Sequence, residues 1–274
     1  MNHHFEASAL GKPSSFLSKY SPSLLFAIPR SECRNLISLF ETVPFYGADL
    51  WTAYELSWLN SKGKPMVAIG EFSFPCMSRN IVESKSFKLY LNSLNQTKFE
   101  STEDVLHCMQ KDLSSLVEAD VKIKIVNLNE FNSQKFQMPE SECLDNLDVF
   151  VDQYEINSEF LFIESDEVVA ENLHTNLLKS NCPVTNQPDW ATLFIHYVGK
   201  KINHVGLLKY IISLRNHNEF HEQCVERIYM DLWRLCMPKL LTVYACYTRR
   251  GGLDIAPFRT NSQVIPENSR FSRR

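Results

Sequence analysis

The chain has 274 residues, 44% of them hydrophobic, so it can bury a substantial core as one large domain or two of ordinary size. Its 28 Lys and Arg against 32 Asp and Glu give a formal net charge of −4, which excludes a basic field over the whole molecule for binding a nucleic-acid backbone. No apolar run approaches the roughly 20 residues that span a bilayer, and the first residues lack a signal-peptide pattern. We therefore expect a cytoplasmic protein with no direct nucleic-acid or membrane contact.

Two strands and a helix are predicted in the first half. The residues from Pro65 to Phe74 and from Ser86 to Leu94 are rich in β-branched and aromatic side chains, which favours strands. The stretch from Ser101 to Leu116 opens with a capping serine and acidic residues and continues with an apolar face, which predicts a helix. The acidic, turn-rich residues from Met138 to Asp148 then form a passage between halves, which we place at 1–140 and 141–274.

A similar order recurs in the second half. A strand is predicted from Trp190 to Ile202, then a segment over 207–235 that changes from strand-like to helical, and a further strand from Leu240 to Thr248. The sequence from Lys88 to Leu113 aligns with that from Lys209 to Leu232, each at the same expected strand-to-helix position. This similarity indicates a fused duplication.

The cysteines are eight in number and dispersed, with no CxxC pair. This pattern favours free thiols in a reducing compartment, and no Cys/His cluster has the spacing of zinc ligands in a short loop. We therefore expect no metal site.

One cysteine stands in a loop stiffened by two prolines, seven residues before an aspartate. The thiolate of Cys182 is a strong nucleophile towards an electrophilic carbon such as that of a carbonyl or nitrile, and the Asp189 carboxyl group could deliver the proton that the growing anion needs. The alternative is that Cys182 is a small buried hydrophobic residue and Asp189 a turn residue.

Three consecutive residues precede or open a predicted helix: Phe220, His221 and Glu222. Here an aromatic ring can stack on a flat ligand while the carboxylate accepts hydrogen bonds from the N–H edge of a guanine-like base. A role in capping the helix is the alternative. An HExxH zinc motif is excluded because Val225 stands in place of the second histidine.

A second polar segment runs from Glu83 to Tyr90. If it is extended, Glu83 and Lys85 share one strand face, and Ser84 lies on the other. An edge strand protected by lysines is the alternative. The sequence has no GxGxxG motif, so a dinucleotide would bind without a Rossmann fold. Lys85 and the turn Arg249–Gly252 could contact its phosphates, although a basic surface turn is an equal explanation.

Together these motifs resemble the QueF family, the NADPH-dependent 7-cyano-7-deazaguanine reductases of queuosine biosynthesis, in its long, two-half form. The resemblance lies in five segments in the same order: YGADLWTAYELSWLNSKGKP, ESKSFKLYLNSLNQT, LLKSNCPVTNQPDW, NEFHEQCVERI and YTRRGGLDIAPFR.

The resemblance implies an α+β fold of two tunnelling-fold (T-fold) halves, each an antiparallel sheet with helices on one face, associating as a homodimer. It implies reduction of the nitrile of 7-cyano-7-deazaguanine by NADPH through a covalent thioimide. The implied catalytic residues are Cys182, Asp189 and His221. The implied substrate-binding residues are Val82, Glu83, Ser84, Phe220, His221 and Glu222, and the implied NADPH contacts are Ser84, Lys85, Arg250 and Gly251.

This mechanism requires the sulfur of Cys182 to be exposed beside a flat heterocycle. Two rival functions stay open on the sequence. One is a T-fold pterin or purine cyclohydrolase, which would use zinc held by Cys and His. The other is a non-catalytic purine-binding protein, in which Glu83 and Glu222 hold a base.

Overall fold

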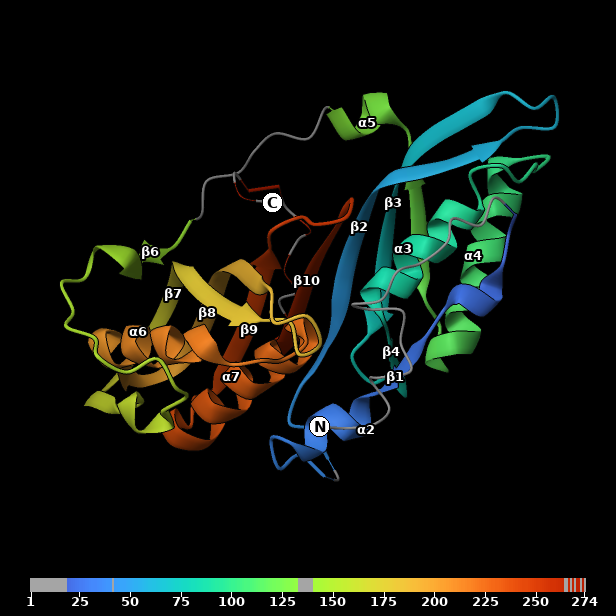
Figure 1. Cartoon of the computed structure of the whole chain (residues 1–274). Coiled ribbons are helices and arrows are strands. Elements are labelled where there is room, and N and C mark those ends of the chain that lie inside the picture. Colours follow the sequence, from blue (N-terminus) through green and yellow to red (C-terminus); the bar gives the residue numbers. More distant parts are fainter. Residues whose placement is uncertain are drawn as a thin grey trace. The chain divides into compact units, whose positions relative to one another are not determined.

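Figure 1 shows the computed structural model of the chain, which describes residues 19–40, 42–132 and 140–263 together with 266, 268, 270, 271 and 273. The chain divides into two compact units. Unit 1 comprises the described residues of 1–41, 49–135 and 249–254, and unit 2 those of 42–48, 136–248 and 255–274. The predicted boundary lies between residues 140 and 141. Each unit therefore includes a short segment from the other predicted half.

Unit 1 contains a three-stranded antiparallel arrangement in the order β5-β3-β2. Its elements in chain order are η1 (Pro22–Leu24), β1 (Ala27–Pro29), α2 (Arg30–Asn35), β2 (Tyr46–Leu59), β3 (Pro65–Pro75), β4 (Asn80–Val82), α3 (Ser84–Ser93), α4 (Thr102–Val117), β5 (Lys122–Val126) and α5 (Leu128–Asn132), with the first three residues of β2 falling in unit 2. A separate antiparallel pair joins β1 to β4. This pair leads directly into α3.

The core of unit 1 lies between this sheet and helices α3 and α4. The ring of Phe87 in α3 meets Trp51 of β2 and Phe72 of β3 edge-on, with centroids 5.5 and 5.0 Å apart. In α4 the fully buried side chains are Val105, Met109, Leu113 and Val117, which share one helix face. Both helices thus cover the same side of the sheet (Figure 1).

Unit 2 contains five strands in the order β10-β9-β8-β7-β6, antiparallel except for the short parallel pair of β6 and β7. Its elements in chain order are β6 (Glu142–Cys143), η2 (Leu144–Asn146), η3 (Ser158–Phe160), β7 (Ile163–Asn181), β8 (Pro188–Ile202), α6 (His204–Ser213), η4 (Leu214–Asn216), α7 (His221–Cys236), β9 (Leu240–Tyr247) and β10 (Leu253–Thr260), with the first two residues of β10 falling in unit 1. Helices α6 and α7 pack on one face of its sheet (Figure 1). The expected α+β class, with antiparallel sheets covered by helices, is confirmed.

Most of the predicted elements are present. Strands β3, β8 and β9 and helices α4 and α7 lie where the sequence predicts them, and Ser101 forms a capping box with Asp104 at the start of α4. Of the predicted passage from Met138 to Asp148, the first two residues lie outside the described ranges. The rest contains β6 and η2, which are both very short.

Two predicted strands are wrong. The segment from Ser86 to Leu94 and the strand-like start of 207–235 belong to helices α3 and α6. In α3 the buried side chains Phe87, Tyr90, Leu91 and Leu94 recur every three or four residues, which is the period of a helix. The Glu83 side chain caps α3, and the Asn203 side chain caps α6. Glu83 and Lys85 therefore do not lie on an extended strand face.

The internal repeat is visible as matched hydrogen bonds. The hydroxyl of Tyr90 in α3 donates to Asp112 Oδ2 in α4 at 2.7 Å, and that of Tyr210 in α6 donates to Asp231 Oδ2 in α7 at 2.6 Å. These pairs lie at corresponding positions of the two aligned segments. Each unit therefore repeats the same helix pair, rather than the strand-to-helix order that we predicted.

Candidate active site

The hairpin between β7 and β8 brings Cys182 and Asp189 to the same end of the sheet. Cys182 N–H donates to Gln187 O at 2.8 Å, and Asn186 N–H donates back to Cys182 O at 3.0 Å. Ser180 is paired with Asp189 across the two strands. Asn186 has a φ of 56°, a left-handed conformation that asparagine tolerates better than most residues. The two residues are thus brought together by a tight turn.

The end of this hairpin is joined to the segment that leads into α7. Asn181 N–H donates to His217 O at 2.8 Å, and Glu219 N–H donates to Asn181 O at 3.0 Å. The side-chain amide of Asn218 donates to Cys182 O at 3.3 Å. These bonds hold the backbone at Cys182 beside the residues that precede His221, the first residue of α7.

Within this group the imidazole of His221 approaches the Asp189 carboxylate, with Nε2 3.1 Å from Oδ2. Both side chains are buried, at 7% and 3% exposed. One face of the imidazole is in contact with an aromatic ring, because Tyr247 of β9 stacks on it with centroids 3.8 Å apart and planes at 13°. The structure therefore joins two of the three predicted catalytic side chains, and it adds Tyr247, which the sequence analysis missed.

The exposure expected for the nucleophile is not found. Cys182 is only 2% exposed, so its thiol is buried within the described part of the chain. Its place one residue beyond β7, against the segment before α7, explains this burial. Phe220 is the N-cap residue of α7, without a side-chain capping bond, and Glu222 is buried in the first turn of that helix. A carboxylate there is favoured by the positive end of the helix dipole.

The remaining predicted site residues lie in unit 1, where β4 ends at Val82 and α3 begins at Ser84. Both carboxylate oxygens of Glu83 accept backbone N–H groups, from Lys85 at 2.7 Å and from Ser86 at 2.8 Å. Burial raises the pKa of Glu83, against the opposing effect of these bonds. A carboxylate has about four acceptor positions, so Glu83 can cap the helix and still accept from a ligand.

The basic turn Arg249–Gly252 also belongs to unit 1. Gly251 and Gly252 have φ values of 59° and 76°, and Gly252 O accepts from Tyr54 N–H at 2.9 Å. A Cβ on Gly252 would lie 2.5 Å from the Glu55 carboxyl carbon, whereas a Cβ on Gly251 would meet nothing within 4 Å. Glu55 in turn pairs with Lys88, one helical turn after Lys85. The two predicted phosphate-binding segments are therefore linked through Glu55.

This donor set fits a phosphate-bearing cofactor. Arg249 and Arg250 are exposed, and the guanidinium of Arg249 lies 3.7 Å from the centre of the Tyr54 ring. The backbone at Gly251 is open, and α3 of the same unit starts with Ser84 and Lys85. Cationic side chains, a glycine turn and a helix N-terminus are the groups that bind phosphate in proteins.

Unit 1 contains a hairpin that corresponds to the one bearing Cys182. Asn60 N–H donates to Lys64 O at 2.9 Å, and Gly63 N–H donates to Asn60 O at 2.9 Å. The preceding residue, Leu59, exchanges backbone bonds with Thr97 and Phe99, as Asn181 does with His217 and Glu219. Asn60 therefore occupies the place that Cys182 has in unit 2.

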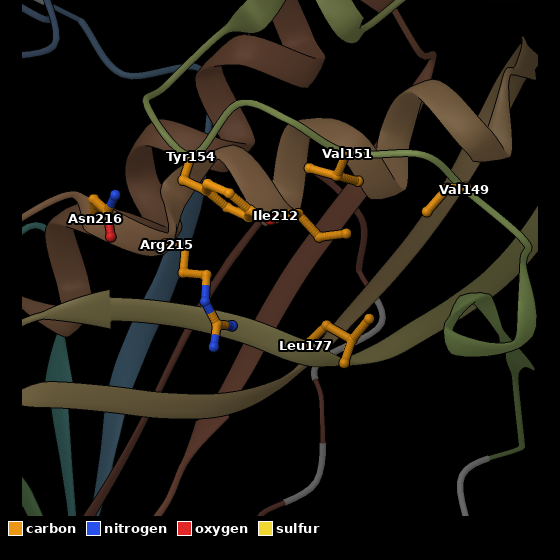
Figure 2. Close-up of a pocket in the computed structure, with 7 residues that line it drawn as sticks. All are labelled: Val149, Val151, Tyr154, Leu177, Ile212, Arg215 and Asn216. Atoms are coloured by element: carbon orange, nitrogen blue, oxygen red, sulfur yellow. The ribbon is translucent and has the colours of Figure 1, made fainter.

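A cavity of about 450 Å³ lies elsewhere in unit 2 (Figure 2). It is lined by Val149, Val151 and Tyr154 from the segment before η3, by Leu177 of β7, by Ile212 of α6, and by Arg215 and Asn216 of η4. None of the predicted site residues lines it.

Within the described ranges, no group of three or more His, Cys, Asp or Glu side chains is arranged to hold a metal ion. Among the helices of the described residues, none is long and apolar enough to cross a bilayer.

The thiol of Cys224, a residue of helix α7, should be much less reactive than an ordinary thiol. Burial raises the pKa of the Cys224 thiol to about 12, so about one molecule in 10⁴ carries a thiolate there at pH 8, and this fraction grows only as the pH rises towards 12. We expect iodoacetamide at pH 8 to leave Cys224 unmodified in the native protein while it modifies the partly exposed Cys143. Peptide mass mapping checks this, with urea-denatured protein as the control. Rapid labelling of native Cys224 would contradict the burial.

Fold and site together define a class of protein: an α+β chain in which a cysteine, an aspartate and a histidine lie at one hairpin end. Family comparisons agree with this class. Residues 16–125 match the family described as nitrile reductase, 7-cyano-7-deazaguanine-reductase N-term, and residues 188–265 match that described as QueF-like protein.

Full-length relatives give the particular family. The chain is 54% identical over 272 residues to a protein of Burkholderia thailandensis and 53% identical over 272 residues to one of Burkholderia mallei, covering 98% of both chains in each case. Both are named NADPH-dependent 7-cyano-7-deazaguanine reductase. A solved structure, the archaeosine synthase QueF-Like in the apo form, matches with a TM-score of 0.31 and 17% identity over 38% of this chain and 100% of that one. The chain belongs to the family of NADPH-dependent 7-cyano-7-deazaguanine reductases.

Proposed function

We propose that this chain reduces the nitrile of 7-cyano-7-deazaguanine to the aminomethyl group with NADPH, through a covalent thioimide on Cys182, as a step in queuosine biosynthesis. The observation that carries the proposal is the end of the β7–β8 hairpin, where Cys182 is held beside the start of α7 and Asp189 lies 3.1 Å from His221. Family membership supplies the substrate and the cofactor.

The chemistry begins with sulfur because a linear nitrile is a poor hydride acceptor. The thiolate of Cys182 adds to the nitrile carbon, one C–N π bond breaks, and the nitrogen takes a proton from Asp189. Cys182 leaves again as a thiolate after the first reduction, when the carbon becomes that of an imine. His221, paired with Asp189, assists the proton movements and helps to enclose the imine, which water would otherwise hydrolyse.

Substrate binding is assigned to the residues that the family resemblance implies. Phe220 stacks on the heterocycle, and Glu222 accepts hydrogen bonds from its N–H edge. Val82, Glu83 and Ser84 complete the binding residues, with Glu83 using the acceptor positions that its capping bonds leave. The burial of Cys182 requires that binding of the base open access to the sulfur.

Ser84, Lys85, Arg250 and Gly251 would hold NADPH, through charge and exposed backbone N–H groups. When bound there, NADPH supplies hydride, two equivalents for each nitrile. The protein positions the reactants, excludes water and supplies protons.

The proposal extends to assembly and location, with the family resemblance as its support. We propose that the halves 1–140 and 141–274 act as tunnelling-fold modules, that two chains form a homodimer, and that the protein works in the cytoplasm. Size-exclusion chromatography with light scattering tests the dimer: a mass of twice 31.8 kDa is expected.

Intact-mass spectrometry tests the proposal. The protein incubated with 7-cyano-7-deazaguanine without NADPH should gain the mass of one substrate, with no loss, because addition to the nitrile expels no group. Cys182→Ala should show no gain, whereas Cys143→Ala, which removes a partly exposed thiol, should behave as the wild type. With NADPH present, two cofactors should be oxidised for each nitrile consumed. Adduct formation in Cys182→Ala, or one cofactor per nitrile, would overturn the mechanism.

A further inference from the structure

The stacking of Tyr247 on His221 is the closest aromatic contact in the described part of the chain. Its centroid distance of 3.8 Å and interplanar angle of 13° place the rings face to face, whereas the other aromatic pairs there have centroids at least 4.9 Å apart. Tyr247 is 1% exposed. One face of the imidazole is therefore covered by a buried ring, while its Nε2 atom lies 3.1 Å from Asp189 Oδ2.

Strand register explains why this tyrosine reaches the site. Tyr247 is the last residue of β9 and is paired with Ala191 of β8. Because side chains alternate along a strand, Asp189 lies on the same face of β8 as Ala191. His221, the first residue of helix α7, reaches this group because its ring stacks on that of Tyr247. The tyrosine, the aspartate and the histidine are thus brought together by three different elements.

The hydroxyl of Tyr247 lies in a buried setting. Burial raises the pKa of Tyr247 well above its ordinary value, and the neighbouring Cys224 and Asp189 contribute to the rise. The phenol therefore stays neutral. Tyr247 therefore lies in the same buried cluster as Asp189 and His221.

The corresponding place in unit 1 lacks this contact. Helices α4 and α7 both end in a left-handed residue, Glu118 and Met237. Counting ten residues from each leads to Leu128 in unit 1 and to Tyr247 in unit 2. Strand β5 has already ended at Val126, whereas β9 continues to Tyr247. The longer strand, which ends in Tyr247, belongs to the unit that contains Cys182, Asp189 and His221.

We propose that Tyr247 is a positioning residue, whose stacked ring holds the imidazole of His221 in place so that Nε2 stays beside the Asp189 carboxylate. Without the ring, the imidazole can rotate about its side-chain bonds, and the proton transfers lose their geometry. The kinetic consequence rests on the proposed function, since it requires His221 to take part in nitrile reduction. The stacking itself does not depend on the proposed function.

Kinetics test the positioning role. We expect Tyr247→Leu to lower kcat by about 10- to 100-fold with little change in KM, because small misplacements of catalytic groups cost factors of this size. Tyr247→Phe keeps the ring and should stay within a few-fold of the wild type. The control is Tyr197→Leu, which removes another fully buried tyrosine of the same sheet face, about 26 Å along β8 from Asp189. A Tyr247→Phe loss as large as that of Tyr247→Leu would overturn the role of the ring.

A double-mutant cycle separates positioning from a general structural effect. If Tyr247 acts through His221, then Tyr247→Leu should cause no further loss of kcat in the His221→Ala background. A multiplied loss, equal to the product of the two single effects, would overturn the proposal.

NMR tests the contact without any activity. In the ligand-free protein, the ring current of Tyr247 should shift the His221 imidazole protons upfield, and the shift should persist in Tyr247→Phe and vanish in Tyr247→Leu. Imidazole shifts that are the same in all three proteins would overturn the stacking. Stacking that persists in a protein without nitrile reduction would instead count against the proposed function alone.

Discussion

Asp189→Asn should lower kcat for nitrile reduction by about 10²- to 10⁴-fold, the usual contribution of a positioned general acid. Asparagine has nearly the same shape and can still contact His221, but it cannot deliver the proton to the nitrile nitrogen. The affinity for the base should change little, because the expected base contacts are on other residues. Loss of NADPH absorbance measures kcat, and calorimetry measures binding.

The matched control for this variant is Asp231→Asn, which alters a half-buried aspartate of the same unit. Asp231 accepts a hydrogen bond from Tyr210 and lies ten residues after His221 in α7. Its substitution should leave kcat within a few-fold of the wild type. Unchanged turnover in Asp189→Asn would refute the role of Asp189 as the acid.

Glu226→Ala should lower the free energy of unfolding by about 3–5 kcal/mol, the usual cost of removing one partner from a buried ion pair. Glu226 of α7 accepts from Arg259 Nε of β10 at 2.9 Å, and the two side chains are 4% and 0% exposed. The substitution leaves a buried guanidinium without this carboxylate. Urea unfolding followed by circular dichroism measures the change.

An exposed ion pair provides the comparison. Asp166 and Lys200 form a salt bridge at 2.5 Å, with side chains 89% and 56% exposed. Solvent screens such a pair, so Asp166→Ala should leave the urea midpoint unchanged. If Glu226→Ala behaved in the same way, the buried pair would contribute nothing to stability.

The elements predicted correctly are those whose pattern is unambiguous. In α4 the capping serine and the fully buried face point to the same conclusion, and β8 alternates along a strand rich in β-branched and aromatic residues. The wrong predictions fall on α3 and α6, where β-favouring residues such as Phe87, Tyr90 and Ile211 lie on the buried face of a helix. Tertiary packing overrides their intrinsic preference.

Strand β7 was not predicted because its first half has no periodic signal. Residues such as Glu164, Asp166 and Glu167 are exposed there, and register shifts interrupt its pairing with β8 near Ser165 and Val168. A polar, irregular strand of this kind is formed by its neighbour rather than by its own composition.

The candidate site could be predicted in part. A loop with two prolines indicated that Cys182 and Asp189 would be close, and the hairpin bonds give the physical reason. Two features depend on tertiary structure alone: the burial of Cys182, and the contact of Tyr247 with His221. The alternation of 240–247 together with its register against β8 would have indicated Tyr247, but register cannot be read from one strand.

The first of the two corresponding hairpins carries an amide side chain where the second carries a thiol. This difference limits the number of thiol sites of this kind to one per chain. Asn60 has the backbone environment of Cys182, but its side chain cannot act as a nucleophile towards a nitrile. Although the polypeptide carries the same scaffold twice, one molar equivalent of an irreversible electrophilic inhibitor directed at the site would therefore saturate it.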